Sequence, residues 1–405
     1  MLLFLLAPLL LAGFLLWRWL ARRRIRLGSL LLYVVVMSGL IWGALRILAE
    51  IAGARVMLRE VLVVLWFAIA WRLAWSIWSR TVGRWGQRWV RWARLQRRRG
   101  AHPPGVIRLI PWGRAALTAV ILFPVFLSMV GTHRCKLRDG HDPSVYQLQF
   151  EAVRIPMADG LTLDGWFIPE ENAERTILVC HGAGANKGNF VWFLSALAHE
   201  GYNVAFFDFR AHGASDGRTT TYGIRERLDV RAAVDWLKRE RPGQSRVVVG
   251  LGSSQGAMAL ALATAEDPRI EAVVLDSPFV SPRELVRGHA ARLPVIGPLA
   301  ADWLLALASL QTGTNFFVAS AEQAVAAMGD RPVLVIHGDG DILMPATHSQ
   351  RLYDAAKGPR EIWFGPGTHS NIVTADPTGY RERVFGFLEK HLGPIPGRRV
   401  RYGKS

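Results

Sequence analysis

Short apolar runs alternate with amphipathic stretches along the chain from about residue 145 onward. The apolar runs read as strands at 147–155, 161–168, 176–180, 204–207, 247–250, 272–275, 332–336 and 361–364. Helical patterns lie between them at 190–200, 224–239, 255–265, 348–356 and 380–391. Strands that alternate with helices form βαβ units around a mostly parallel sheet. We therefore predict an α/β domain over residues 147–393, built on an eight-stranded, mostly parallel sheet flanked by helices.

The first third of the chain has a different character. Residues 1–140 carry 22 Lys and Arg against three acids, whereas the remaining residues carry 27 against 29, so the net charge of +17 arises at the N-terminal end. Four apolar stretches lie there, at 2–19, 27–48, 60–78 and 112–129. Each is close to the ~20 residues that cross a hydrocarbon core. Basic residues beside apolar runs are typical of membrane proteins rather than of nucleic-acid binding.

We therefore predict an all-α transmembrane region of about four helices over 1–131, contact with membrane lipid and no nucleic-acid partner. The first stretch lacks a basic segment before it, which favours an uncleaved span over a signal peptide. Arginines crowd the links after the first and third stretches, so these links are expected in the cytoplasm of a bacterial-type inner or plasma membrane. The domain after residue 129 is then extracytoplasmic. In the third link, 80–108, Trp85, Trp89 and Trp92 share one helical face and predict an amphipathic helix in the headgroup layer.

Cysteine and metal-ligand patterns say little about chemistry. The two cysteines, Cys135 and Cys180, imply no disulfide framework, and no spacing typical of a metal site occurs. We expect neither a metal nor a cofactor.

A nucleophile motif follows the predicted strand at 247–250. The pentapeptide Gly252-Ser253-Ser254-Gln255-Gly256 has the form G-x-S-x-G and runs into a helical stretch. On a strand-to-helix turn this motif exposes a strained serine, and the two glycines avoid clashes. Ser254, which has glycine two residues before and after it, is the predicted nucleophile.

A serine hydroxyl needs a base, and the base needs a carboxylate. Three histidines stand near predicted strand ends, at His181, His337 and His369. His369 follows the last strand and suits the chain order Ser, acid, His, so we predict it as the base. Asp339, Asp341 and Asp276 are the candidate acids.

An oxyanion needs two fixed N–H donors. The backbone N–H of Gln255 is one candidate, and Ala183, in the small-residue loop after the strand at 176–180, offers the other. A phosphate-binding loop is the alternative for that glycine-rich segment, but no lysine-serine pair of the Walker type follows it.

Between about 148 and 392 the chain resembles the α/β-hydrolase superfamily, in the branch with serine-aminopeptidase-like and dienelactone-hydrolase-like domains and membrane-anchored members. The resemblance rests on blocks that occur in order: His181-Gly182 with Asn186; Asp208 to Gly213 with Ser215 and Gly217; the motif at Ser254; Asp276 to Phe279; His337-Gly338 with Asp341; and Gly367 with His369. It implies the fold and a Ser254–His369–Asp341 triad, since the family acid is the last residue of HGxxD. It also implies a short cap, at 280–327, which shapes substrate choice.

These features predict a membrane-anchored serine hydrolase that cleaves carboxylic esters or thioesters through an acyl-enzyme. The substrate would be a small or lipid-like acyl compound, because the cap is short and apolar. A serine peptidase is the alternative within enzymes, and a non-catalytic hydrolase-fold module of a membrane assembly is the alternative outside them. Residues 132–146 are expected to be a linker and 394–405 a basic tail.

Overall fold

The computed structural model of the chain describes residues 127–133, 136, 141–197, 200–291 and 296–394, together with Arg88, Arg91, Trp92 and Leu95. The chain divides into two compact units, Met1–Phe123 and Pro124–Ser405. The four described residues of the first unit are helical. The predicted spans lie outside the described residues, apart from 127–129, and so does most of the predicted helix in the third link. Within the described part of the chain, no helix is both long and apolar enough to cross a bilayer.

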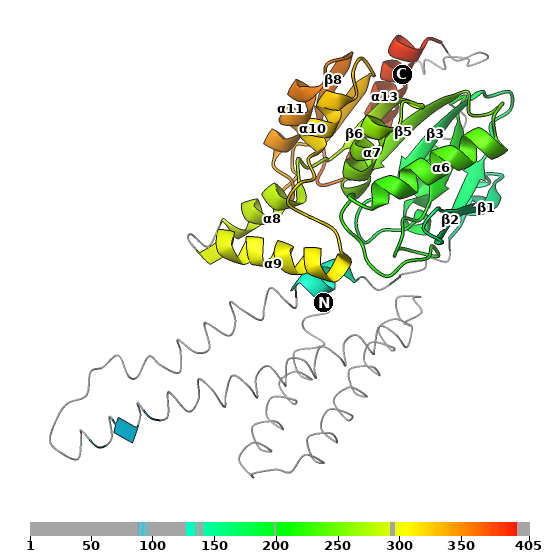
Figure 1. The fold of residues 1–405 in the computed structure, drawn as a ribbon. Helices are drawn as coiled ribbons and strands as arrows, with labels where there is room; N and C mark the ends of the chain where they lie inside the picture. The colour runs from blue at the N-terminus through cyan, green and yellow to red at the C-terminus, as the bar shows by residue number, and fades with distance from the viewer. Residues whose placement is uncertain are drawn as a thin grey trace. The chain divides into compact units, whose positions relative to one another are not determined.

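The second unit is built on one eight-stranded sheet (Figure 1). Its strands are β1 (Glu151–Pro156), β2 (Thr162–Ile168), β3 (Arg175–Cys180), β4 (Asn203–Phe207), β5 (Val247–Ser253), β6 (Ile270–Asp276), β7 (Val333–Gly338) and β8 (Arg360–Gly365). Their order is β1-β2-β4-β3-β5-β6-β7-β8. β2 runs antiparallel to both neighbours, and the pairs from β4 to β8 are parallel. The predicted mostly parallel sheet of eight strands is confirmed.

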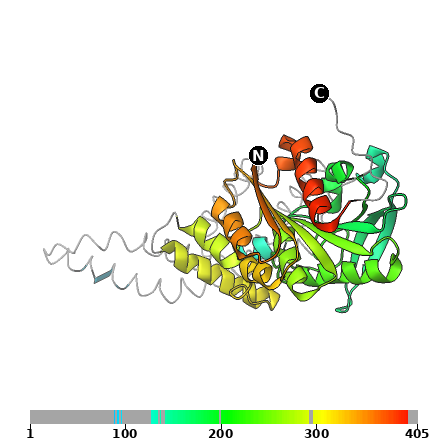
Figure 2. The same cartoon turned by 90° about the horizontal axis from the view of Figure 1, so that it is seen from above.

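Helices cover both faces of this sheet (Figure 1 and Figure 2). One face carries α6 (Glu226–Glu240), α7 (Gln255–Glu266), α10 (Ala321–Ala327) and α11 (Ala346–Ala355). The other carries α5 (Val191–Leu197), α12 (Ile372–Ala375) and α13 (Pro377–Leu392). Two short 3-10 helices, η2 (Pro143–Tyr146) and η3 (Lys187–Phe190), lie in the connections. Parallel strands are joined by such crossover helices, which cover both faces of the sheet. Functional residues therefore lie in the loops at the carboxyl ends of the strands.

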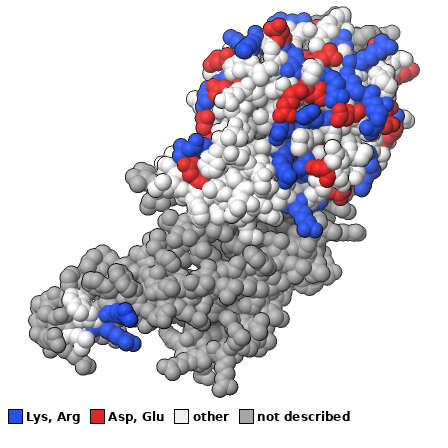
Figure 3. Space-filling view, in the orientation of Figure 1, with Lys and Arg blue, Asp and Glu red and all other residues white. Residues whose placement is uncertain are grey.

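A pair of helices follows β6, within the range that was predicted to be the cap. They are α8 (Pro282–Ala290) and α9 (Ile296–Thr312), which pack against each other. Ser281 caps α8 by accepting a hydrogen bond from the backbone N–H of Glu284, and Pro282 suits the first helical position. Figure 3 shows a largely uncharged surface where α9 lies, whereas charged side chains crowd the upper part of the same domain. The last part of the predicted cap, α10, instead packs on α7 and α11.

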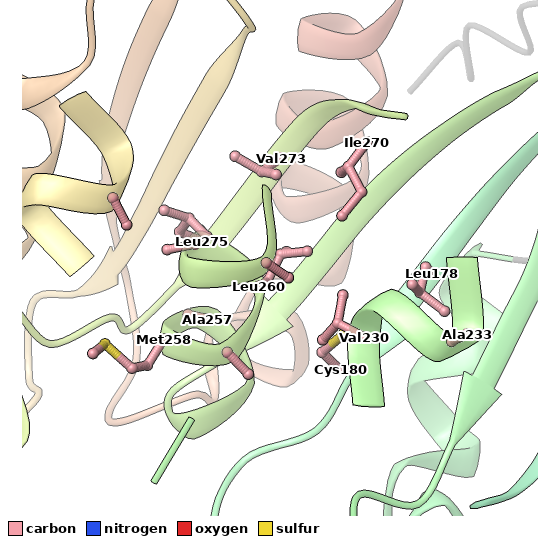
Figure 4. Packing of buried hydrophobic residues seen from close by; sticks show 14 of the residues in the cluster. Leu178, Cys180, Val230, Ala233, Ala257, Met258, Leu260, Ile270, Val273 and Leu275 are labelled. Atoms are coloured by element: carbon pink, nitrogen blue, oxygen red, sulfur yellow. The ribbon is translucent and has the colours of Figure 1, made fainter. Parts of the chain in front are cut away.

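The core lies on both sides of the sheet because alternate residues of one strand face opposite layers. In β3, Leu178 and Cys180 pack toward α6 and α7, and Ile177 and Val179 pack toward α5 and α13. Figure 4 shows the first layer, with Leu178, Cys180, Ile270, Val273 and Leu275 of the sheet against side chains of α6 and α7. Burial on both faces explains the short continuous apolar runs in the sequence.

Candidate active site

The predicted nucleophile lies on a sharp turn between β5 and α7. Ser254 has φ 52° and ψ −111°, a sparsely populated backbone conformation that costs a non-glycine residue about 1–3 kcal/mol. A Cβ on Gly252 would lie 2.6 Å from the carbonyl oxygen of Gly256, and a Cβ on Gly256 would lie 2.1 Å from that of Cys180. Gly252 is therefore required for β5 to turn closely into α7, and Gly256 is required for the turn to pack against β3.

The structure brings Ser254, His369 and Asp341 into one hydrogen-bonded chain. His369 follows β8, and its Nε2 lies 3.0 Å from Ser254 Oγ. Its Nδ1 lies 2.7 Å from Asp341 Oδ2, in the loop after β7. Because a carboxylate can only accept, Nδ1 carries the proton and Nε2 is free to accept the serine proton. The three residues therefore have the arrangement of a nucleophile, a base and an orienting acid.

Asp341 is held in its ionised form by its surroundings. Its other oxygen, Oδ1, accepts hydrogen bonds from the backbone N–H groups of Leu343, at 2.8 Å, and Met344, at 2.9 Å. Burial raises the pKa of Asp341, but the hydrogen bonds from His369 and the two N–H groups outweigh burial and lower the pKa below its ordinary value. A carboxylate that stays charged can stabilise an imidazolium at His369.

The other two candidate acids have different partners. Asp339 accepts a hydrogen bond from the backbone N–H of Gly367 at 3.3 Å, and its own N–H donates to the Gly365 carbonyl at 3.0 Å. It therefore ties the loop after β7 to the loop after β8. Asp276, at the end of β6, is buried, and it accepts hydrogen bonds from the hydroxyls of Ser277 and Tyr380.

The remaining histidines near strand ends are buried and shape loops. Burial, and after it the neighbouring His212, lower the pKa of His181 to about 3, so the ring is neutral. His181 Nε2 accepts from the Phe209 N–H at 3.0 Å, and Nδ1 donates to the Gly182 carbonyl at 2.8 Å. His337 Nδ1 bonds the hydroxyl of Ser349 at 2.8 Å, and burial lowers the pKa of this ring.

The two predicted oxyanion donors stand on elements that meet at the turn with Ser254. Gln255 is the first residue of α7, where a backbone N–H has no intrahelical acceptor. The loop with Ala183 lies beside it, since a Cβ on Gly182 would be 3.6 Å from Ser254 Cβ. The N–H of Gly184 donates to His212 at 3.4 Å, which helps to fix this loop. Within the described residues no group of three or more His, Cys, Asp or Glu could hold a metal ion.

Comparison with known proteins identifies the family of the second unit. The family described as serine aminopeptidase, S33, matches residues 171–315. An uncharacterized Bacillus subtilis protein, YqkD, is 31% identical over 260 residues, which are 62% of this chain and 84% of YqkD. The chain belongs to the α/β-hydrolase superfamily.

Two further relatives of this α/β-hydrolase are informative. The Pyrococcus furiosus esterase Pf2001 has 27% sequence identity and a TM-score of 0.55, over 64% of this chain and 98% of the esterase. A Saccharomyces cerevisiae protein, described as the uncharacterized membrane protein YNL320W, is 24% identical over 251 residues, or 61% of this chain and 82% of its own. The superfamily and a hydrolase activity are thus supported over the second unit.

The α/β-hydrolase site also contains residues that sequence reasoning missed. The hydroxyl of Ser277 accepts a hydrogen bond from the Ser370 N–H at 3.0 Å, and Ser253 Oγ donates to Ser370 Oγ at 2.8 Å. Ser370 directly follows His369. Ser277 in turn donates to Asp276 at 2.9 Å, so a buried polar chain supports the loop of the base. The block Asp276-Ser277 belongs to the resemblance, but no local pattern marks the Ser277 hydroxyl as a partner of the Ser370 N–H.

A buried ion pair between Lys187 and Asp208 holds the C-terminal end of the loop with Ala183. Lys187 Nζ lies 2.8 Å from Asp208 Oδ2 and 2.6 Å from Asp164 Oδ1, and the Lys187 N–H donates to Asp208 Oδ1 at 2.6 Å. Burial raises the pKa of Asp208, but Lys187 and the surrounding donors outweigh burial and lower it. Removing one member of such a pair would leave an uncompensated buried charge.

Proposed function

We propose that this α/β-hydrolase is a membrane-anchored serine hydrolase that cleaves carboxylic ester or thioester bonds. The observation that carries the proposal is the chain of hydrogen bonds from Ser254 Oγ through His369 to Asp341, at 3.0 and 2.7 Å. Similarity to the esterase Pf2001 favours ester hydrolysis. The small-molecule substrate would be an acyl compound, and no cofactor takes part in the proposed reaction.

The proposed reaction has two acyl-transfer steps. Ser254 Oγ attacks the carbonyl carbon while its proton passes to His369 Nε2, and Asp341 stabilises the imidazolium. The N–H groups of Ala183 and Gln255 donate to the oxyanion. The ester bond then breaks, the leaving alcohol or thiol takes the proton from His369, and the acyl group stays on Ser254. A water molecule, activated by His369, releases the acid and restores the serine.

The nucleophile assignment is tested with a fluorophosphonate probe on the full chain in detergent. We expect one adduct, located on Ser254 by mass spectrometry, and its loss in Ser254→Ala. Ser144→Ala, which changes an exposed serine of η2, serves as the handling control and should label normally. Undiminished labelling of Ser254→Ala would overturn the proposal.

The bond that is cleaved needs a substrate comparison. The match to a family described as serine aminopeptidase favours a peptidase as the second candidate. We expect hydrolysis of p-nitrophenyl esters of graded chain length and of a matched thioester, with slow or no cleavage of peptides that have a free N-terminus. Faster turnover of the peptides than of the esters would replace the esterase proposal with the peptidase.

Anchoring rests on the four apolar stretches and their arginine-rich links. The similarity to a yeast protein described as a membrane protein supports it. We expect the full chain to stay with the membrane fraction after carbonate washing. A reporter that works only outside the cytoplasm should be active when fused after Ser405, and activity of a cytoplasm-only reporter instead would reverse the proposed sidedness.

A further inference from the structure

The cap helix α9 is apolar on two opposite sides. Its inner side is packed, since Leu305 and Ala308 are buried in a cluster with Ile224 and Phe316. On its outer side Leu299, Trp303 and Leu310 are 71%, 45% and 82% exposed. Spacings of four and seven residues put these three side chains on one face of the helix. A helix that is apolar all round is normally covered on both sides.

No free charge interrupts this outer face. Asp302 is the one charged residue in the sequence of α9, and it is paired with Arg287 of α8, whose Nε lies 2.9 Å from Asp302 Oδ1. The surface over α9 is accordingly almost free of charged side chains in Figure 3. Exposed apolar groups also stand beside the proposed acid, because Ile342 and Leu343 directly follow Asp341.

A second helical segment ties α9 to the predicted membrane region. Residues 127–132 are helical, and they overlap the end of the apolar stretch at 112–129. Ser128 Oγ donates to Gln311 Oε1 of α9 at 2.9 Å, and Thr132 Oγ1 donates to the same oxygen at 3.3 Å. Residues at the end of the last predicted stretch therefore contact α9 directly.

The same segment is fixed to the domain at other points. The Thr220 N–H donates to the Thr132 carbonyl at 2.8 Å, and the Tyr222 hydroxyl donates to the Gly131 carbonyl at 3.2 Å. Leu127 and Val130 remain exposed on its outer side. At 1.5 Å rise per residue, Gln311 lies within about one helical turn of the end of the predicted span.

We propose that a lipid face, formed by Leu299, Trp303 and Leu310 of α9 with Leu127 and Val130, lies in the interfacial layer of a phospholipid bilayer. Tryptophan is favoured at that depth, and an apolar helix face binds there by burying its side chains among the acyl chains. This inference rests on the proposed membrane anchoring. On this proposal, an apolar ester would reach the domain from the bilayer through the lipid face.

The depth of the lipid face is measured by spin labelling of the full chain in nanodiscs of phosphatidylcholine and phosphatidylglycerol at about three to one. A nitroxide is placed at Leu310→Cys or Leu299→Cys in a Cys135→Ser background. Cys180 is buried, and burial raises the pKa of its thiol, so it does not compete for the label. Val145→Cys, at an exposed apolar position of η2 on the α5 side, is the matched control.

Labels at 299 and 310 should be reached by dissolved oxygen far more than by a water-soluble nickel chelate, and the label at 145 should show the reverse. Free access of the chelate to position 310 would overturn the proposal. Exclusion of both reagents would also overturn it, since a second copy or another protein would then cover α9.

A catalytic measurement tests whether the lipid face contributes to the hydrolysis of a membrane-embedded ester. Leu299→Gln with Leu310→Gln should lower turnover of a long-chain ester embedded in the nanodisc by about tenfold. Turnover of a water-soluble acetate ester should stay unchanged, because these residues lie outside the triad. Equal turnover of the embedded ester by variant and parent would contradict the route through the lipid face. The accessibility of the spin labels is measured without catalysis, and incorporation of the chain into nanodiscs reports membrane anchoring by itself. Failure of the proposed hydrolase function can therefore be distinguished from failure of the lipid face.

Discussion

The hydroxyl of Ser277 accepts a hydrogen bond from the backbone N–H of Ser370 at 3.0 Å, one residue beyond the proposed base. Both residues have positive φ, 50° and 54°, as Ser254 does. The backbone of His369 is therefore held from β6 as well as by its own side-chain contacts. Fixing a base within a fraction of an ångström contributes to rate through orientation.

Ser277→Ala replaces serine by a residue with a similar tolerance of positive φ, and it removes the hydroxyl that accepts from the Ser370 N–H. We expect kcat for an ester to fall about tenfold with little change in KM, because the loop of His369 loosens. The rate is expressed per active site, titrated with the fluorophosphonate. Ser349→Ala is the matched control, since its buried hydroxyl bonds His337 instead. It should lose stability while kcat per titrated site is retained, and an equal fall in kcat would refute the positioning role of Ser277.

The two aspartates of the loop after β7 provide a second matched pair. Asp341→Asn should lower kcat by about three to four orders of magnitude, because the amide cannot hold the imidazole in its catalytic tautomer. Asp339→Asn should keep most of the rate, since Asp339 bonds only loop backbone. The measurement is ester hydrolysis by both variants under one condition. If Asp339→Asn were the inactive variant, the acid would be misassigned.

Substitutions at Gly256 and Gly182 are expected to differ in their effect on the free energy of unfolding. Gly256→Ala puts a Cβ 2.1 Å from the Cys180 carbonyl oxygen, which is backbone and cannot move aside. We expect a loss of about 3 kcal/mol or failure to fold. Gly182→Ala meets ordinary contacts at 3.6 Å and should change stability by about 0.5 kcal/mol or less. Thermal unfolding followed by tryptophan fluorescence checks both, and similar melting of the two variants would contradict the packing described.

Asp276 predicts an unusual pH dependence of stability. Burial raises the pKa of Asp276 to about 6, although the Ser277 and Tyr380 hydroxyls partly oppose it. The unfolded value is about 3.9. The native state therefore binds the proton more tightly, so its contribution to stability is present below about pH 4 and is lost as the pH rises through 6.

Asp276→Asn removes this titration. The melting temperature of the parent, relative to that of the variant, should fall between about pH 4 and pH 7. Thermal unfolding of both chains across this range is the measurement. A difference that rises with pH would mean that the carboxylate is stabilised in the native state, against the expectation from its burial.

Local patterns were sufficient to predict the sheet. They singled out Ser254 and His369 as site candidates but left three acids open, and Asp341 was predicted only from the resemblance to the superfamily. The strand at 247–250 was predicted too short, because Gly252 and Ser253 have weak strand propensity and join β5 only through pairing with β3 and β6. The predicted cap included α10, although this helix packs on α7 and α11. Ser320, which accepts from the Gln323 N–H, was the capping signal that could have separated it.

Long-range contacts were beyond the reach of sequence patterns. Residues 127–132 fell across the predicted boundary between membrane region and linker, yet Ser128 and Thr132 bond a glutamine about 180 positions away. The support of the His369 loop by Ser277 spans 93 positions. A lone serine leaves no periodic signal, so its partner becomes visible only once the strands are aligned.

The strand order also has a consequence for biosynthesis. β3 pairs on one side with β4, the strand that follows it, but on the other side with β5, so the centre of the sheet cannot close before Val247 has been made. Ser254 then remains without its base for 115 further residues. During synthesis the predicted spans emerge from the ribosome well before any of this. On the proposed function, a growing chain would therefore be inserted in a bilayer while still inactive, and hydrolysis would begin only after β8 has joined the sheet.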